Sequence, residues 1–172
     1  MNPPAPLRLI GMLASRQQWD RRMTDQPAIL AILPDERFTG LVEDLKASGA
    51  TVLHVFSCAV AQRILAAEVP ICLIVTIPGL PDGSWRSLLM TAVSHGLNPQ
   101  IMVVAEQMDG GWEDFLDMGV WHVWTPALGR EGFVTACNAA IESWLSLRRI
   151  PELLLERAIR EGAMTPSAQD RR

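Results

Sequence analysis

Short runs of apolar, often β-branched residues recur along the chain, and segments whose apolar residues have helical spacing separate them. The run 28–33 contains six apolar residues in succession, and the run 71–77 is interrupted by a single threonine. Strands with one face in solvent alternate apolar and polar residues, whereas unbroken runs are typical of strands buried on both faces. The pattern therefore predicts five buried strands, at residues 28–33, 51–56, 71–77, 101–105 and 120–124.

The segments between these strands have the pattern of amphipathic helices. The first of them has four apolar residues at i, i+3, i+4 and i+7, on one helical face: Phe38, Leu41, Val42 and Leu45. Similar stripes, which include Val60 in the second helix and Val93 in the third, predict helices at 35–48, 57–69, 84–96, 109–119 and 133–149. Regular alternation of strand and helix predicts a parallel sheet with right-handed crossovers. The expected fold class is α/β, a doubly wound five-stranded (βα)5 sandwich of the flavodoxin type.

Proline and polar stretches set the expected limits of this domain. Residues 1–27 are rich in proline, glutamine and arginine without sustained periodicity, so we expect a flexible lead-in. Pro151 follows the last helix of the (βα)5 unit, and the apolar residues beyond it predict a sixth helix before a polar tail. We therefore expect one domain at 28–149 and an extra helix with a polar tail at 150–172.

Composition narrows the class of protein. With 172 residues and 49% hydrophobic content, the chain can bury the core of one domain and has an apolar surplus for a partner interface. Its net charge of −4 gives no general attraction to phosphates, which argues against a nucleic-acid partner. Three widely spaced cysteines in apolar surroundings indicate core residues in a reducing compartment. No apolar run approaches the roughly 20 residues of a membrane span, so we expect a cytoplasmic protein without membrane association.

Chemistry in a parallel sheet collects in the loops at the carboxyl ends of the strands. The third strand ends in Thr76 and Ile77, with no acid near its end, and leads into the turn-rich loop 78–84. The sequence contains neither a GxGxxG motif nor a GxxxxGK[ST] motif at a strand–helix junction, so no phosphate-binding loop and no cofactor is expected. Because no nucleophile, base and orienting residue converge in the pattern, we expect no enzymatic activity.

Four strand ends carry short motifs: Leu33-Pro34-Asp35-Glu36, Leu80-Pro81-Asp82-Gly83, Ala105 and Thr125-Pro126. Together with the (βα)5 order, they resemble the receiver domain of bacterial response regulators, the CheY-like family, over about residues 28–149. In that family an aspartate that ends the third strand accepts a phosphoryl group, and acids after the first strand hold Mg²⁺. A serine or threonine ends the fourth strand, and a lysine precedes a proline after the fifth. The resemblance implies a signalling domain.

Most of that phosphorylation machinery is missing here. Thr76 is the polar residue nearest the acceptor position, and Ala105 stands where the family has its hydroxyl. Thr125 replaces the lysine, and Lys46, the only lysine in the chain, lies in the first predicted helix. The resemblance therefore implies a degenerate receiver, or pseudo-receiver, whose vestigial pocket would comprise Asp35, Glu36, Thr76, Ala105, Thr125 and Pro126.

Two further features of the resemblance concern a metal and a switch. Asp35 and Glu36 precede a helix, whose positive N-terminal end favours acids without any ion, so we expect no bound metal. Glu106 lies close to the same pocket by register. His122 falls at a position that the family fills with tyrosine or phenylalanine. It is a candidate pH-dependent switch, or else a histidine with an ordinary structural role in a strand.

Two classes of function remain open. The leading hypothesis is a non-catalytic module of a bacterial two-component-type pathway, which binds a kinase, an output protein or its own copy in a homodimer without phosphoryl transfer. Aromatic residues are enriched in interface cores, although core packing of at least two of the tryptophans is an equal alternative. The candidate interface residues are Trp112, Trp121, Trp124, Trp144 and Leu154. The other hypothesis is a small-ligand or cofactor-binding flavodoxin-like protein that uses the loop 78–84.

Overall fold

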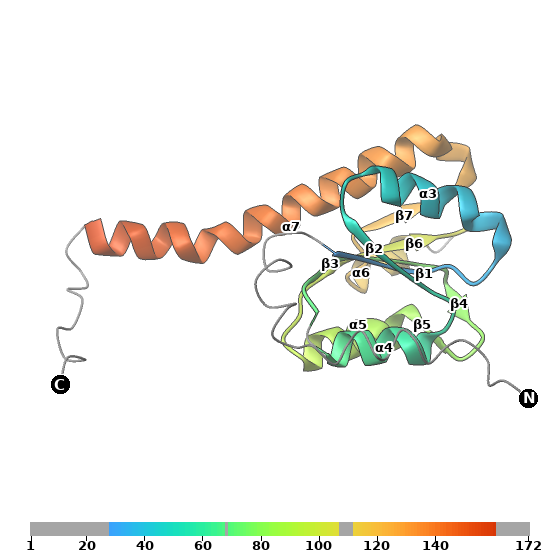
Figure 1. The fold of residues 1–172 in the computed structure, drawn as a ribbon, viewed down its shortest axis with the longest axis horizontal. Coiled ribbons are helices and arrows are strands. Elements are labelled where there is room, and N and C mark those ends of the chain that lie inside the picture. The colour runs from blue at the N-terminus through green and yellow to red at the C-terminus, as the bar shows by residue number, and fades with distance from the viewer. Residues whose placement is uncertain (1–27, 68, 107–111, 161–172) are drawn as a thin grey trace, which may run out of the picture.

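The computed structural model describes residues 28–67, 69–106 and 112–160, with the backbone alone at residue 112 and at 148–160. Within these residues, five parallel strands form one sheet in the order β2-β1-β3-β6-β7. The strands are β1 (Ala28–Ile32), β2 (Thr51–Val55), β3 (Ile71–Thr76), β6 (Gln100–Val104) and β7 (His122–Trp124). The predicted α/β class and doubly wound sheet are confirmed (Figure 1).

Helices cover both faces of the sheet (Figure 1). One face packs against α3 (Thr39–Ala47) and α7 (Gly129–Arg160), and the other against α4 (Cys58–Ala66) and α5 (Trp85–Ser94). The shorter elements are η2 (Glu36–Phe38), β4 (Gly79–Leu80), β5 (Gly83–Ser84), α6 (Trp112–Asp117) and η3 (Pro126–Leu128). The hydrophobic core therefore consists of two layers, one on each side of the sheet.

The central strand β3 is buried along its whole length, as its apolar run predicts. It pairs with β1 on one side and with β6 on the other. The register with β1 shifts at Cys72, whose thiol donates to the carbonyl oxygen of Ala28 at 3.2 Å. Beyond this irregularity, Ile74 faces the α4–α5 layer, whereas Leu73 and Val75 face the α3–α7 layer. Both core layers thus depend on β3.

The cysteines belong to these layers. Cys58, Cys72 and Cys137 are all free and buried, as predicted for core residues. Burial raises the pKa of the Cys72 and Cys137 thiols to about 12, so both stay protonated at neutral pH. Protonated, buried thiols are poor nucleophiles and poor metal ligands.

An ion pair joins the two helices on one face of the sheet. Arg130 at the start of α7 donates through Nε to Oδ2 of Asp44 in α3 at 2.8 Å, and through a second nitrogen to Oδ1. The hydrogen bonds from this guanidinium lower the pKa of Asp44. The pair is largely exposed on the arginine side, so it orients α3 and α7 more than it stabilises them.

Two predicted details of the helices are wrong. Val60 and Val93 are 43% and 57% exposed, because α4 buries Cys58, Ala61 and Leu65, and α5 buries Trp85, Leu88 and Ala92. The predicted turn-rich loop 78–84 contains a short antiparallel hairpin of β4 and β5. No helix boundary falls at Pro151, since α7 continues as one helix of 32 residues to Arg160. The separate sixth helix predicted after Pro151 is therefore the distal part of α7.

Candidate functional site

A pocket of about 350 Å³ lies at the carboxyl edge of the sheet, beside the ends of β1, β3 and β6. In parallel α/β sheets this edge is where ligands and catalytic groups gather. Three short segments line the pocket: Arg37 and Phe38 after β1, Ile77, Pro78 and Gly79 after β3, and Val104, Ala105 and Glu106 at the end of β6. The pocket is thus built from the loops that the sequence singled out.

Arg37 is the one basic residue among the described residues that line this pocket. Its Nε lies 2.9 Å from Oδ2 of Asp35, and one terminal nitrogen forms an ion pair with Oε1 of Glu106. Its guanidinium also lies 4.8 Å from the centre of the Phe38 ring. Asp35 is the N-cap of η2 and accepts a hydrogen bond from the Arg37 backbone N–H at 3.0 Å. One cation of the chain therefore pairs with carboxylates from two different strand ends.

Of the six residues predicted for the vestigial pocket, one lines the pocket, one contacts it through Arg37, and the other four do not line it. Ala105 lines the pocket, and its N–H donates to the carbonyl oxygen of Trp124 at 2.9 Å. Thr76 is fully buried, and its hydroxyl donates to the carbonyl oxygen of Ile77 at 3.3 Å. Asp35 reaches the pocket through Arg37. Glu36, Thr125 and Pro126 are not among the residues that line it, because Glu36 begins η2 and the other two follow the edge strand β7.

The resemblance to receiver domains implies a Mg²⁺ ion at this edge, but the donor set does not fit one. Magnesium needs carboxylate oxygens free to coordinate it, usually together with waters. Here the carboxylates of Asp35 and Glu106 both pair with Arg37, and β3 ends in Thr76. Within residues 28–67, 69–106 and 112–160, no group of three His, Cys, Asp or Glu side chains could hold a metal ion.

A second polar contact, at Asp82, fastens the β4–β5 hairpin to α4. Asp82 lies in the turn between the two strands, and its carboxylate accepts the backbone N–H of Cys58 at 2.8 Å and of Ala59 at 2.9 Å. These are free donors in the first turn of α4, whose N-cap is Ser57. Gly83 allows this approach, because a Cβ there would lie 2.6 Å from Sγ of Cys58. The loop after β3 is therefore held in one position.

Neutralising Asp82 is expected to destabilise the domain in a pH-dependent way. The hydrogen bonds from Ala59 and Cys58 lower the pKa of Asp82. Because its pKa is lower in the folded state, the carboxylate stabilises the fold fully at pH values above its pKa in the unfolded chain, about 3.9. This stabilisation is lost as the pH falls through the pKa of the folded state. We expect Asp82→Asn to lower the urea midpoint at pH 7, and the difference between the two proteins to be smaller at pH 3. An equal difference at both pH values would contradict the charge-dependent clasp.

His122 and Trp121 lie at the start of the edge strand. His122 is the first residue of β7 and is half-buried, and its ring centre lies 5.8 Å from that of Trp121. Burial lowers the pKa of His122 below 6.5, so the imidazole is neutral at pH 7. Trp121 precedes the strand and packs, partly buried, against the α3–α7 layer.

Two of the tryptophans predicted as interface residues are core residues instead. Trp124 is 5% exposed, donates through Nε1 to the carbonyl oxygen of Gly129 at 3.0 Å and packs edge-on against Phe133. Trp144 is 8% exposed and belongs to the same layer. For these two, the alternative of core packing holds, because both side chains are buried in the layer between α7 and the sheet. The side chains of Trp112 and Leu154 lie outside the described residues.

The pattern of residues did not predict the ion pairs of Arg37 or the role of Asp82. The signal for Arg37 was its place two residues after Asp35, at the start of a helix that faces the pocket. The signal for Asp82 was an acid in a tight turn, which can cap a helix that lies far away in the sequence. Neither pairing can be read from spacing alone, because both join segments that the fold brings together.

No protein-family model and no curated protein matches this sequence. Solved structures do match it. The signal receiver domain of a putative LuxO repressor from Vibrio parahaemolyticus aligns with a TM-score of 0.63 and 13% identity, over 73% of this chain and 97% of that one. A signal receiver domain of an HD domain-containing protein from Pseudomonas fluorescens aligns with a TM-score of 0.62 and 16% identity, over 74% and 95%.

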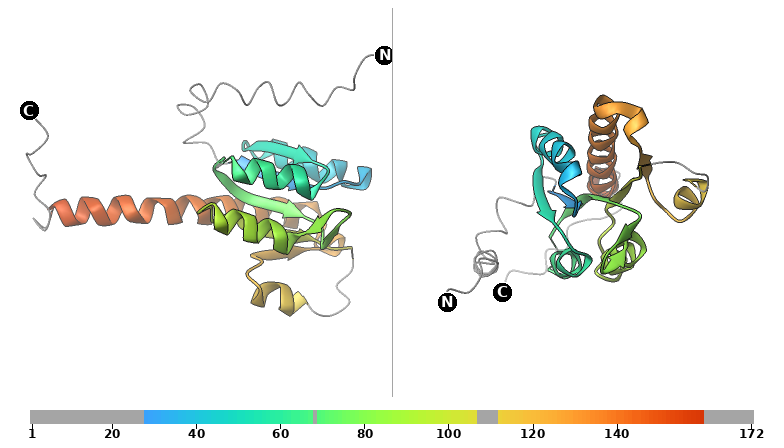
Figure 2. Two further views of the ribbon diagram at one scale, coloured as in Figure 1. Left: turned by 90° about the horizontal axis from the view of Figure 1, so that it is seen from below. Right: turned by 90° about the vertical axis from the view of Figure 1, so that its right-hand side faces the viewer.

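A third match extends further along this chain. It is a trimeric coiled-coil segment of yeast Spc42 fused to another structure, with a TM-score of 0.64 and 12% identity, over 81% of this chain and 92% of that one. Helix α7 is the one described element that runs well beyond the sheet (Figure 2). Taken together, the matches show that this chain has the fold of a response regulator receiver domain.

Proposed function

We propose that this chain is a pseudo-receiver, a non-catalytic signalling module of two-component type that acts by binding another protein without phosphoryl transfer. The observation that carries the proposal is Arg37, which pairs with both Asp35 and Glu106 at the carboxyl edge of the sheet. Phosphoryl transfer to a receiver needs a carboxylate nucleophile and a divalent ion that neutralises the phosphoryl charge. In this pocket the chain supplies its own cation, and β3 ends in a threonine.

A fixed pocket suits constitutive binding better than switching. The ion pairs of Arg37 join the η2 turn to the end of β6, and the clasp of Asp82 joins the loop after β3 to α4. The loops that would respond to a phosphoryl group therefore each contact a neighbouring element. In the proposal, residues 28–149 are the module, 1–27 and 150–172 flank it, and its partner in the cytoplasm is a kinase, an output protein or a second copy. No helix in the described part of the chain is long and apolar enough to cross a bilayer.

The proposal predicts that the protein does not accept a phosphoryl group. After incubation with acetyl phosphate and millimolar Mg²⁺, we expect the intact mass to be unchanged. A receiver domain with a complete acidic pocket, treated in parallel, should gain the mass of one phosphoryl group and serve as the control for the reagent. A stable adduct on this chain would overturn the proposal.

The stability of the protein is also expected to be independent of Mg²⁺. A ligand that binds the folded state alone raises the melting temperature with its concentration. Because the pocket carboxylates already pair with Arg37, we expect melting curves with and without millimolar Mg²⁺ to coincide. An increase of several degrees would indicate that Asp35 and Glu106 release Arg37 to bind the metal.

A small-ligand site is the second candidate function, and the pocket itself supports it. Its volume of about 350 Å³ falls at the low end of the range for ligand sites, and Pro78 and Gly79 of the predicted loop line it. An absorbance spectrum of the purified protein would reveal a flavin or another conjugated ligand. We expect a spectrum with protein absorbance alone.

A further inference from the structure

Helix α7 is much longer than the sheet that it covers. Its 32 residues span about 48 Å at a rise of about 1.5 Å per residue. The longest strand of the sheet, β3, has six residues and spans about 20 Å. A helix that runs back along such a strand needs about 13 residues, so α7 is more than twice as long as the strand requires. Figures 1 and 2 show the distal part of α7 projecting away from the domain.

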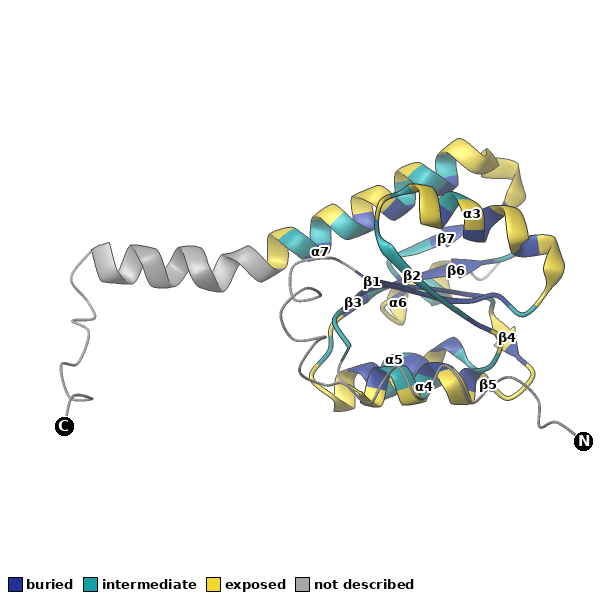
Figure 3. Cartoon of the chain, in the orientation of Figure 1, coloured by how far each residue is buried: buried dark blue, intermediate teal, exposed yellow. Residues whose placement is uncertain are grey.

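The buried residues of α7 form one line with a regular spacing. Phe133, Cys137, Ala140 and Trp144 are separated by four, three and four residues, and all are at most 8% exposed. The next residue in this spacing is Leu147, which is 47% exposed because the sheet no longer covers the helix there. We call these five residues the α7 stripe. Among the described side chains of α7, burial is confined to the part over the sheet (Figure 3).

A spacing of alternately three and four residues is that of helix pairs in coiled coils. The same spacing continues in the sequence to Pro151, Leu154 and Ala158, over which the backbone remains helical. Proline in a helix removes one intrahelical hydrogen bond, and a projecting helix of some four turns has little stability of its own in water. The distal part of α7 therefore needs packing against another surface to stay helical.

We propose that the distal part of α7, from Leu147 onward, packs against the same segment of a second copy of this chain. The spacing is suited to a helix as the partner, and the continuation of the α7 stripe is present in every copy. A two-fold pairing covers both exposed segments at once and leaves neither open to further association. The inference rests on the proposed function, since it names a second copy as the partner of the module.

Leu147 and Leu128 give a matched pair of variants that test this dimer. Both are exposed leucines, at 47% and 51%, but Leu128 lies in η3 before α7 begins and is outside the α7 stripe. By sedimentation equilibrium of the full chain at tens of micromolar, we expect the wild-type protein to be a dimer. Leu147→Glu should raise the dimer dissociation constant at least about tenfold, and Leu128→Glu should leave it unchanged.

Several results would overturn the inference. A monomeric wild-type protein would do so, as would a dimer that Leu147→Glu weakens no more than Leu128→Glu does. If Leu147→Glu does not fold, Leu147→Gln provides a second variant with high helix propensity, and it should weaken the dimer in the same direction. The phosphorylation assay measures the mass of the chain and does not depend on dimerisation. A protein that does not dimerise therefore leaves the pseudo-receiver proposal standing, and a phosphoryl adduct leaves the dimer test valid.

Discussion

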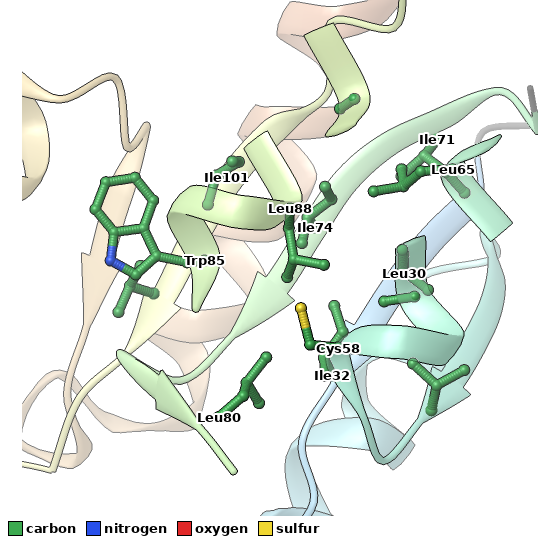
Figure 4. Close-up of a cluster of buried hydrophobic side chains, with 14 of the residues drawn as sticks. Leu30, Ile32, Cys58, Leu65, Ile71, Ile74, Leu80, Trp85, Leu88 and Ile101 are labelled. Atoms are coloured by element: carbon green, nitrogen blue, oxygen red, sulfur yellow. The ribbon is translucent and has the colours of Figure 1, made fainter. Parts of the chain in front are cut away.

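Replacing Ile74 with aspartate is expected to remove a large part of the stability of the domain. Ile74 is fully buried in the central strand, where it pairs with Leu30 of β1 and Ile101 of β6. Its side chain lies among apolar residues that include Leu88 of α5 (Figure 4). A carboxylate there would have neither water nor a cation, and an uncompensated buried charge costs about 3–5 kcal/mol. Domains of this size are stable by about 5–15 kcal/mol, so the loss should be visible as a large fall in the urea midpoint.

The matched control for this variant is Ile74→Val. It removes one methylene group at the same position and should cost about 0.5–1.5 kcal/mol. The comparison also bears on the pocket, since Ile74→Asp brings an acid near the end of β3 without supplying its cation. The aspartate variant could instead unfold cooperatively with nearly wild-type stability and be labelled by acetyl phosphate. That result would contradict both the burial of β3 and the proposed loss of the phosphorylation machinery.

The sheet could be predicted because its strands are buried on both faces. Runs such as 28–33 and 71–77 show no alternation, and a run of that kind between amphipathic helices has few interpretations other than a parallel strand. The phase of α4 could not be predicted in the same way. Val60 and Ala61 are both apolar, and the packing of α4 against the sheet and α5 decides that Ala61 is buried and Val60 is exposed.

The end of α7 shows where a local rule fails. Proline usually marks a helix boundary, so the sequence predicted a break at Pro151. The backbone nevertheless continues as a helix to Arg160. Proline propensity describes an isolated helix, and packing against another surface can offset it. The single long helix is what makes the exposed Leu147 informative, because it extends the α7 stripe beyond the domain.

The candidate site was predictable in what it lacks and not in what replaces it. The missing acid after β3 and the single lysine are visible in the sequence. The pairing of Arg37 with Glu106 depends on β1 and β6 ending at the same edge of the sheet, with β3 between them. An arginine side chain is long enough to reach across that edge, but sequence spacing does not indicate which of the nearby acids it contacts.

Trp124 provides the sharpest test of core against interface on the β7 side of the sheet. Trp124→Ala should cost about 3–5 kcal/mol of unfolding free energy, because the indole is buried beside Phe133. Trp124→Phe keeps most of the packing and loses the hydrogen bond to the carbonyl oxygen of Gly129, so it should cost about 1 kcal/mol beyond the lost volume. Urea unfolding measures both losses of stability. The dissociation constant of the dimer, measured on folded protein, should be the same for each variant as for the wild type. A Trp124→Ala protein with unchanged stability and weakened self-association would place this tryptophan in an interface.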